Sequence, residues 1–178
     1  MKPFRLLVTG VIALFLANSA YAAEKWISQN WVLDKTGQNH EAYTINESKS
    51  SFGVFCSGEK CLFYLHQGLN CTPGAKYSVL MNSLSVSTAI RMECSQIGGN
   101  LFQILDPFDA VYQAVGTGQM IGFAVALQSG AFAVNRFSLL GAKPAIDRAL
   151  LEAAKSKLKE QKTAPKNDPK TKLKDIQI

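Results

Sequence analysis

The sequence has few of the residues from which enzymes build catalytic sites. Only two histidines occur among its 178 residues, His40 and His66, and there is no Gly-x-Ser-x-Gly elbow or glycine-rich phosphate loop. A Cys–His nucleophile would need a free thiol beside one of these histidines. Glu59 and Glu93 could form a carboxylate pair, but their spacing does not require one. We therefore expect no enzymatic activity, no catalytic residue and no cofactor. If the protein were an enzyme after all, alanine substitution of His66 or Glu93 should remove its activity.

Basic charge is scarce in the body of the chain. The whole sequence carries a formal net charge of +6, but Lys2 and Arg5 lie at the N-terminus, and residues 155–178 hold eight lysines against three acidic residues. Residues 23–154 are left with nine basic and ten acidic residues. Nucleic-acid-binding domains cluster basic residues on an ordered face. We therefore expect no nucleic-acid partner.

The sequence also lacks an apolar segment typical of a membrane-spanning helix. The apolar run at residues 6–16 is shorter than the roughly twenty residues that a span requires. Residues 111–134 are numerous enough, but glycines and glutamines interrupt them. We therefore expect no transmembrane span once the N-terminal segment has been removed.

The N-terminus itself predicts export. Lys2 and Arg5 precede the apolar run, and Ala20-Tyr21-Ala22 has the small-x-small pattern of a signal-peptidase site. No cysteine follows that site, which argues against a lipid anchor. Residues 1–22 are therefore predicted to be a signal peptide, and the mature protein is expected to be periplasmic or secreted.

The four cysteines predict two disulfides. Residues 52–65 read as two β-strands joined by a short turn, with Cys56 and Cys61 facing each other across it. Half a zinc site is the alternative, but Cys71 and Cys94 are too far apart to supply its second half. Exported chains fold under oxidising conditions, so we predict the pairs Cys56–Cys61 and Cys71–Cys94 among three possible pairings. The longer bridge is expected to stabilise the fold by about 3 kcal/mol.

Several further segments predict a mainly β domain. Residues 120–127 and 131–140 are almost continuously apolar, and we expect them to form a hairpin buried in the domain centre. Residues 108–115 are ambiguous and compatible with a short helix. Other strands are expected to start at Trp31 and to cover residues 42–45, 77–81, 86–94 and 101–105. The expected architecture is a disulfide-stabilised β-sandwich or partly open barrel of about seven to nine short strands.

The C-terminal part predicts one helix and a basic tail. Pro144 suits a first helical turn, and apolar residues then recur at helical spacing. A single domain, residues 23–160, is expected to end with this helix, and residues 161–178 are expected to form a disordered lysine-rich tail. The tail is either an inert terminus or an electrostatic handle for acidic partners or anionic surfaces. As a handle it would use Lys162, Lys166, Lys170, Lys172 and Lys174.

Three local features together suggest a family. Phe52 stands four residues before Cys56, a second cysteine follows with an apolar strand behind it, and Ser138-Leu139-Leu140-Gly141 runs into Ala145-Ile146. In these features the chain resembles the invasion-associated locus B family of small exported bacterial proteins. The wide spacing of Cys71 and Cys94 departs from the close cysteine pair of that family. The resemblance implies an all-β secreted or envelope protein with no known chemistry.

Export, disulfides and an apolar β-rich body favour a binding protein over an enzyme. We expect a non-enzymatic exported protein that binds envelope or host proteins, as a soluble component of a bacterial envelope or secretion assembly. One alternative is a secreted virulence or adhesion factor of the family that the chain resembles. The other is a periplasmic enzyme with an unrecognised site.

Overall fold

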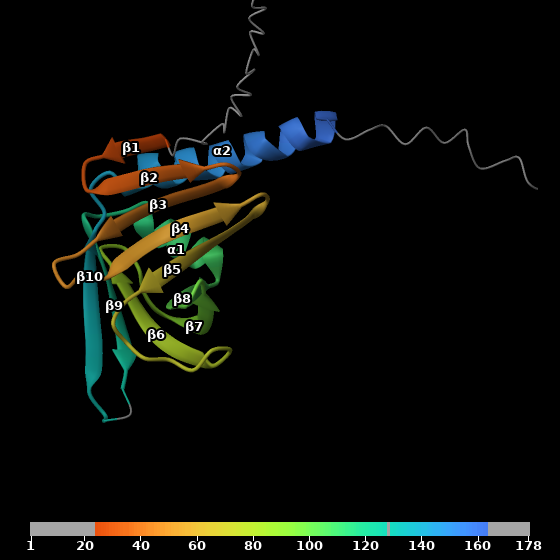
Figure 1. Cartoon of the computed structure of the whole chain (residues 1–178). Helices are drawn as coiled ribbons and strands as arrows, with labels where there is room; N and C mark the ends of the chain where they lie inside the picture. Colours follow the sequence, from red (N-terminus) through yellow and green to blue (C-terminus); the bar gives the residue numbers. More distant parts are fainter. Residues whose placement is uncertain (1–23, 128, 164–178) are drawn as a thin grey trace, which may run out of the picture.

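The computed structural model describes residues 24–127 and 129–163 (Figure 1). The predicted signal peptide and most of the predicted tail, including Lys166, Lys170, Lys172 and Lys174, lie outside the described residues. Within the described part, no helix combines the length and the apolar character needed to cross a membrane.

Ten strands and two helices occur in the described part of the chain. The strands are β1 (Glu24–Ser28), β2 (Trp31–Thr36), β3 (Asn39–Ile45), β4 (Ser51–Ser57), β5 (Lys60–His66), β6 (Lys76–Ser83), β7 (Ser87–Ile97), β8 (Asn100–Asp106), β9 (Met120–Ala126) and β10 (Phe132–Ser138). The helices are α1 (Phe108–Val115) and α2 (Ala142–Thr163). The fold is therefore mainly β, as predicted, with one more strand than the expected range.

All ten strands belong to one antiparallel sheet that curls into a half-barrel (Figure 1). Their order is β1-β2-β3-β4-β5-β8-β7-β6-β9-β10, so the sheet departs from a meander at two places, where β5 pairs with β8 and where β6 pairs with β9. The curl brings the end of β10 back to the start of β2, where Trp31 Nε1 donates to the Ser138 carbonyl at 2.8 Å. Of the two predicted architectures, the partly open barrel is present and the two-sheet sandwich is not.

An aromatic cluster fills the concave side of the sheet. The fully buried ring of Phe52 lies 5.1 to 6.0 Å, between centroids, from the rings of Trp31, Phe63, Phe123 and Phe137. Four rings besides Phe52 surround it: two come from β2 and β5 in the first half of the strand order, and two come from β9 and β10 at its other end. Tilted and edge contacts between rings add to the stabilisation from burial. The cluster therefore holds the two ends of the sheet together.

Both predicted disulfides are present. Cys56 on β4 is directly opposite Cys61 on β5, with their Cα atoms 4.1 Å apart. Cys71 lies in the loop between β5 and β6 and is bonded to Cys94 on β7, with Cα atoms 5.9 Å apart. No cysteine is free. The first bridge closes one hairpin, whereas the second attaches a long loop to the sheet.

The apolar run at residues 120–140 differs from its prediction. It does form a hairpin, β9 and β10, but this hairpin is not in the domain centre, because β10 is the last strand of the sheet. Ile121 and Phe123 point into the core, whereas Phe132 and Val134 are more than half exposed. The prediction of a buried hairpin was wrong because the outward positions of a strand with one buried face were counted as core.

The C-terminal helix covers the concave side of the first strands. Helix α2 packs on β2, β3 and β4 through small residues and Ile146, all buried. Pro144 lies in its first turn, as predicted, and the ambiguous segment 108–115 is helix α1. Helix α2 continues to Thr163, so Lys162, expected in the tail, is helical.

Glu152 joins α2 to the sheet and makes stability depend on pH. Its carboxylate accepts hydrogen bonds from Lys155 Nζ at 2.9 Å and Lys35 Nζ at 3.1 Å, and these two ammonium groups lower the pKa of Glu152 to about 2. A lowered pKa in the folded state stabilises the protein above the usual pKa of about 4.3, and this contribution is lost as the pH falls toward 2.

Replacing Glu152 with glutamine is therefore expected to lower the free energy of unfolding by about 1 kcal/mol at pH 7, a small effect because partly exposed ion pairs are weak. Near pH 2, where the carboxylate becomes protonated, the difference is expected to disappear. Urea unfolding of both proteins across this pH range measures the difference. The same substitution at Glu47, an exposed loop residue, is the control. A cost for Glu152→Gln that stays constant with pH would contradict the electrostatic role.

Candidate protein-binding face

The residues singled out by the sequence for possible catalysis are not assembled into one site. The Nδ1 atom of His66 lies 2.9 Å from the Leu101 carbonyl, and the His66 ring packs on Phe102. Glu59 lies in the turn between β4 and β5. His40 is fully buried beneath α2, and that burial lowers its pKa. Each histidine thus has a packing role at a separate place in the sheet.

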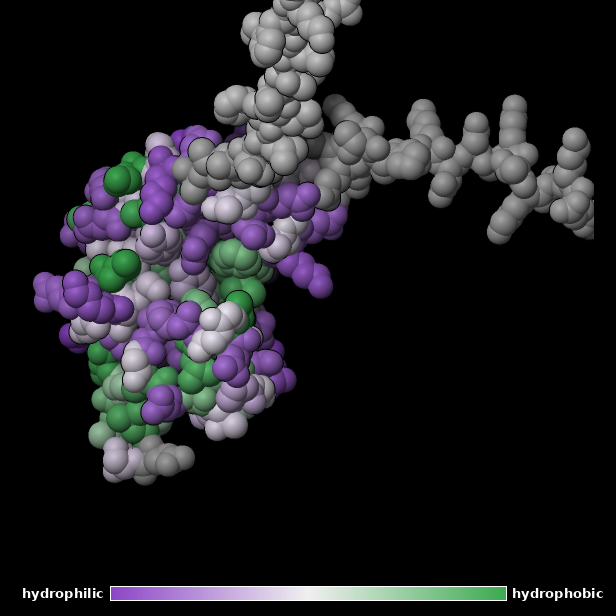
Figure 2. Space-filling view, in the orientation of Figure 1, coloured by the Kyte–Doolittle hydropathy of each residue, from purple (hydrophilic) through white to green (hydrophobic). Residues whose placement is uncertain are grey.

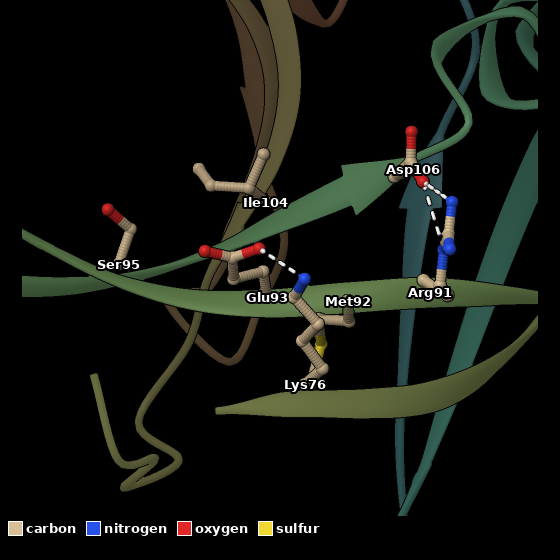
Figure 3. Close-up of a pocket in the computed structure, with 7 residues that line it drawn as sticks. All are labelled: Lys76, Arg91, Met92, Glu93, Ser95, Ile104 and Asp106. Atoms are coloured by element: carbon tan, nitrogen blue, oxygen red, sulfur yellow. Dashed lines mark hydrogen bonds and ion pairs between the residues drawn. The ribbon is translucent and has the colours of Figure 1, made fainter. Parts of the chain in front are cut away.

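Glu93 lies in a charged groove on the outer side of β6, β7 and β8 (Figure 3). The groove has a volume of about 370 Å³, with Ile104 among the residues that line it. Glu93 Oε2 lies 3.8 Å from Lys76 Nζ, and the guanidinium of Arg91 donates to Asp106 Oδ2, from Nε at 3.0 Å. Because the four charges pair with one another, the groove has no excess charge with which to attract an ion. No group of three potential metal ligands occurs among the described residues.

An apolar hollow of about 200 Å³ lies next to this groove and shares Ile104 with it. Its central side chain, Tyr64, is only 4% exposed and donates a hydrogen bond to Glu41 Oε1 at 2.6 Å. Burial, and then the negative charge of Glu41, raise the pKa of Tyr64. Tyr64 also packs edge-on against Phe102.

The outward side of β6, β9 and β10 is different, because its apolar side chains remain exposed. We define the β9 face as the outward side chains of Leu80, Met120, Ala124, Phe132 and Val134. The four larger ones are 48 to 59% exposed. Figure 2 shows hydrophobic residues gathered on the part of the surface where β9 and β10 run in Figure 1. Contiguous exposed apolar surface of this kind marks interaction sites in soluble proteins.

Strand register explains why the β9 face is hollow. Ala124 on β9 lies between Leu80 on β6 and Val134 on β10, and Gly122 lies between Asn82 and Arg136 in the next row. Small residues on the middle strand therefore leave a trough of about 330 Å³ between larger residues on its two neighbours. Among the residues that the structure describes, Arg136 is the only charged one that lines the trough.

The trough lies beside an edge of the sheet. In the described part of the chain, β10 pairs with β9 and with no other strand. Near its end, the Arg136 carbonyl accepts a hydrogen bond from Asn46 Nδ2 at 3.3 Å. An edge strand can template pairing with another chain. The β9 face and the edge of β10 therefore form one continuous surface. A partner could contact apolar side chains on the face and backbone groups at the edge.

Sequence reasoning missed this surface. The alternation of Phe132, Val134 and Arg136 on one side of the strand, opposite Phe137, was a usable signal. The alternation is weak in β9, where the outward residues are alanine and glycine and resemble core positions. Both disulfides, by contrast, were predicted correctly from the sequence. The predicted partner-binding lysines beyond Thr163 lie outside the described residues.

Together these features define a small antiparallel half-barrel, tied by two disulfides and covered by a C-terminal helix. The fold is similar to the crystal structure of invasion associated protein B from Bartonella henselae, with a TM-score of 0.53 and 12% sequence identity. The similarity covers 74% of this chain and 99% of that one. It confirms the predicted resemblance at the level of the fold. No protein-family model and no curated protein matches the sequence.

Proposed function

We propose that this chain is an exported, non-enzymatic protein that binds another protein through the β9 face. The observation that carries this proposal is the exposed apolar trough beside β10. In the described part of the chain β10 pairs with β9 alone, and side chains occupy only its Arg136 and Ser138 carbonyls near the end of the strand. Leu80 and Val134 border the trough, and both are more than half exposed although core positions lie next to them along their strands. Residues with this exposure bury substantial apolar surface when a partner covers them.

The charge of the trough favours a protein partner over a lipid surface. Surfaces that bind anionic lipid headgroups carry several basic residues, whereas the trough has Arg136 alone. An extended segment of the partner would pair with the backbone of β10 and insert apolar side chains into the trough over Ala124. Such strand addition takes its affinity from main-chain hydrogen bonds and its specificity from alternate side chains.

The proposed location is the periplasm or the extracellular medium. Two disulfides support it, because such bonds persist in oxidising compartments, as does the signal-peptide pattern of residues 1–22. The partner would then be an envelope protein. The lysines of the tail would add weak contact with acidic partners or anionic surfaces, and deletion of residues 164–178 would test that contribution separately.

A second candidate is a host-directed virulence or adhesion factor. The observation that favours it is the fold shared with a protein named for invasion. The two candidates differ in where the protein accumulates. A host-directed factor is expected in the culture supernatant of intact cells, whereas an envelope component is expected in the envelope fraction after crosslinking.

Charge introduced into the β9 face is expected to abolish partner binding. The double variant Leu80→Glu/Val134→Glu would bury two unpaired carboxylates at the interface. We expect it to reduce the crosslinked partner recovered from native cells at least tenfold, measured by quantitative mass spectrometry.

The matched control is Leu151→Glu/Leu158→Glu, which changes two similarly exposed leucines on α2. The control is expected to retain partner recovery, with an unchanged melting temperature in both variants. Equal recovery from the two double variants would overturn the assignment of the β9 face.

A further inference from the structure

The apolar hollow of about 200 Å³ beside the charged groove is a second candidate site, and it shares no lining residue with the trough of the β9 face. Its lining surface is mainly apolar. Phe55, Leu62 and Phe102 in its walls are partly exposed, and Ile97 at the end of β7 is about half exposed. Sites for drug-sized ligands have volumes of about 300 to 1,000 Å³. The hollow is therefore open to solvent and suits a smaller chemical group.

Among the residues that the structure describes, Glu41 is the only charged one that lines the hollow. Its Oε1 accepts the hydrogen bond from Tyr64 Oη at 2.6 Å. No lysine, arginine or histidine in the described part of the chain forms an ion pair with it. Glu41 is partly exposed, so a small cation can approach it from solvent. The hollow thus has a carboxylate without a cationic partner.

The charges of the adjoining groove do not balance Glu41. In that groove Lys76 pairs with Glu93, and Arg91 pairs with Asp106 (Figure 3). These four side chains together contribute no net charge. The hollow therefore combines apolar and aromatic walls with one unbalanced negative charge, and this combination is complementary to an organic cation.

We propose that the hollow binds a small organic cation that carries a methylated ammonium group, as choline does. The methyl groups pack against the apolar walls, and the positive charge lies near Glu41. Aromatic side chains, of which the hollow has three, favour quaternary ammonium ligands. A neutral ligand leaves the charge of Glu41 without a partner, and an anion is repelled by it. This site is independent of the proposed binding of a protein at the β9 face.

The test compares choline with 3,3-dimethylbutan-1-ol, in which a carbon atom replaces the nitrogen so that the shape is kept and the charge is removed. Each is titrated into the purified disulfide-bonded protein at equal ionic strength while backbone amide shifts are followed by NMR. Choline is expected to shift the amides of Glu41, Tyr64 and Phe102, and to bind at least tenfold more tightly than the alcohol. In Glu41→Gln this preference is expected to disappear, although the glutamine carbonyl can still accept the hydrogen bond from Tyr64.

A pair of variants at the rim tests the same charge effect without touching the Glu41–Tyr64 hydrogen bond. Ile97→Arg is expected to weaken choline binding at least threefold, and Ile97→Glu to strengthen it at least threefold, because both place a charge at the hollow from an exposed position. Ile45→Arg is the control, since Ile45 is similarly exposed but lies four residues along β3 from Glu41. That separation is about 13 Å, beyond the range of about 8 Å over which salt leaves surface charges unscreened. Choline binding is therefore expected to be unchanged.

Four results would each overturn the proposal. They are equal affinity of the unaltered protein for choline and the alcohol, equal choline affinity of the two Ile97 variants, amide shifts confined to residues outside the hollow, and no binding of choline.

Discussion

Replacing Gly141 with alanine is expected to lower the free energy of unfolding by at least about 3 kcal/mol. Gly141 connects β10 to α2 with a φ angle of +86°, and a Cβ atom there would lie 1.9 Å from the Ser28 carbonyl oxygen. The Asn30 amide donates to the neighbouring Leu140 carbonyl at 3.2 Å. The first turn of the sheet and the start of α2 are therefore packed backbone to backbone, and a methyl group would force them apart.

A matched glycine separates this clash from the strain of a positive φ angle. Gly99, in the turn between β7 and β8, has a φ angle of +84°, and a Cβ atom added there would meet no other part of the protein within 4 Å. Gly99→Ala is therefore expected to lower the free energy of unfolding only by the strain of placing alanine at a positive φ angle, about 1 to 2 kcal/mol. Chemical denaturation of both variants measures the difference. Equal costs would contradict the close approach of Ser28 to Gly141.

Phe52→Ala is expected to destabilise the fold by about 4 kcal/mol, since the ring is fully buried at the centre of the aromatic cluster. The loss combines the apolar surface that Phe52 buries with the cavity left among rings from both ends of the sheet. We also expect near-UV circular dichroism to weaken, because Phe123 and Phe137 would lose their fixed neighbour.

Phe132→Ala provides the comparison for this cost. Phe132 is 59% exposed on the outward side of β10, and surface substitutions usually change stability by less than about 0.5 kcal/mol. Urea unfolding of both variants is the measurement. A cost for Phe52→Ala below about 1.5 kcal/mol would show that the two ends of the sheet are not held together by this cluster.

Features determined by local sequence were predictable. The hairpin of β4 and β5 was recognisable because Cys56 and Cys61 flank a short turn, and its register places them directly opposite each other. The start of α2 was recognisable from Pro144 and helical periodicity. The Cys71–Cys94 pair followed from the first pair once export was assumed. The hairpin and the helix start depend on residues that are close in sequence. The second disulfide was predictable because only two cysteines remained once the first pair had been assigned.

Features determined by long-range packing were not predictable. Nothing in residues 60–66 indicates that β5 pairs with β8 rather than with β6, because that choice depends on how the whole sheet curls. The same curl places β10 at an edge. The apolar residues of β9 and β10 then face solvent on one side, although their sequence composition is that of a buried hairpin. The candidate binding face therefore required the structure.

The most direct test of the proposed function is site-specific photocrosslinking in native cells. A photoreactive amino acid is introduced at Val134 in the β9 face and, in a separate protein, at Leu151 on α2, which is equally exposed. We predict a crosslinked product of discrete mass from position 134 that is lost when Leu80→Glu is added, and no such product from position 151. Absence of a product at position 134, or the same product from both positions, would contradict the account.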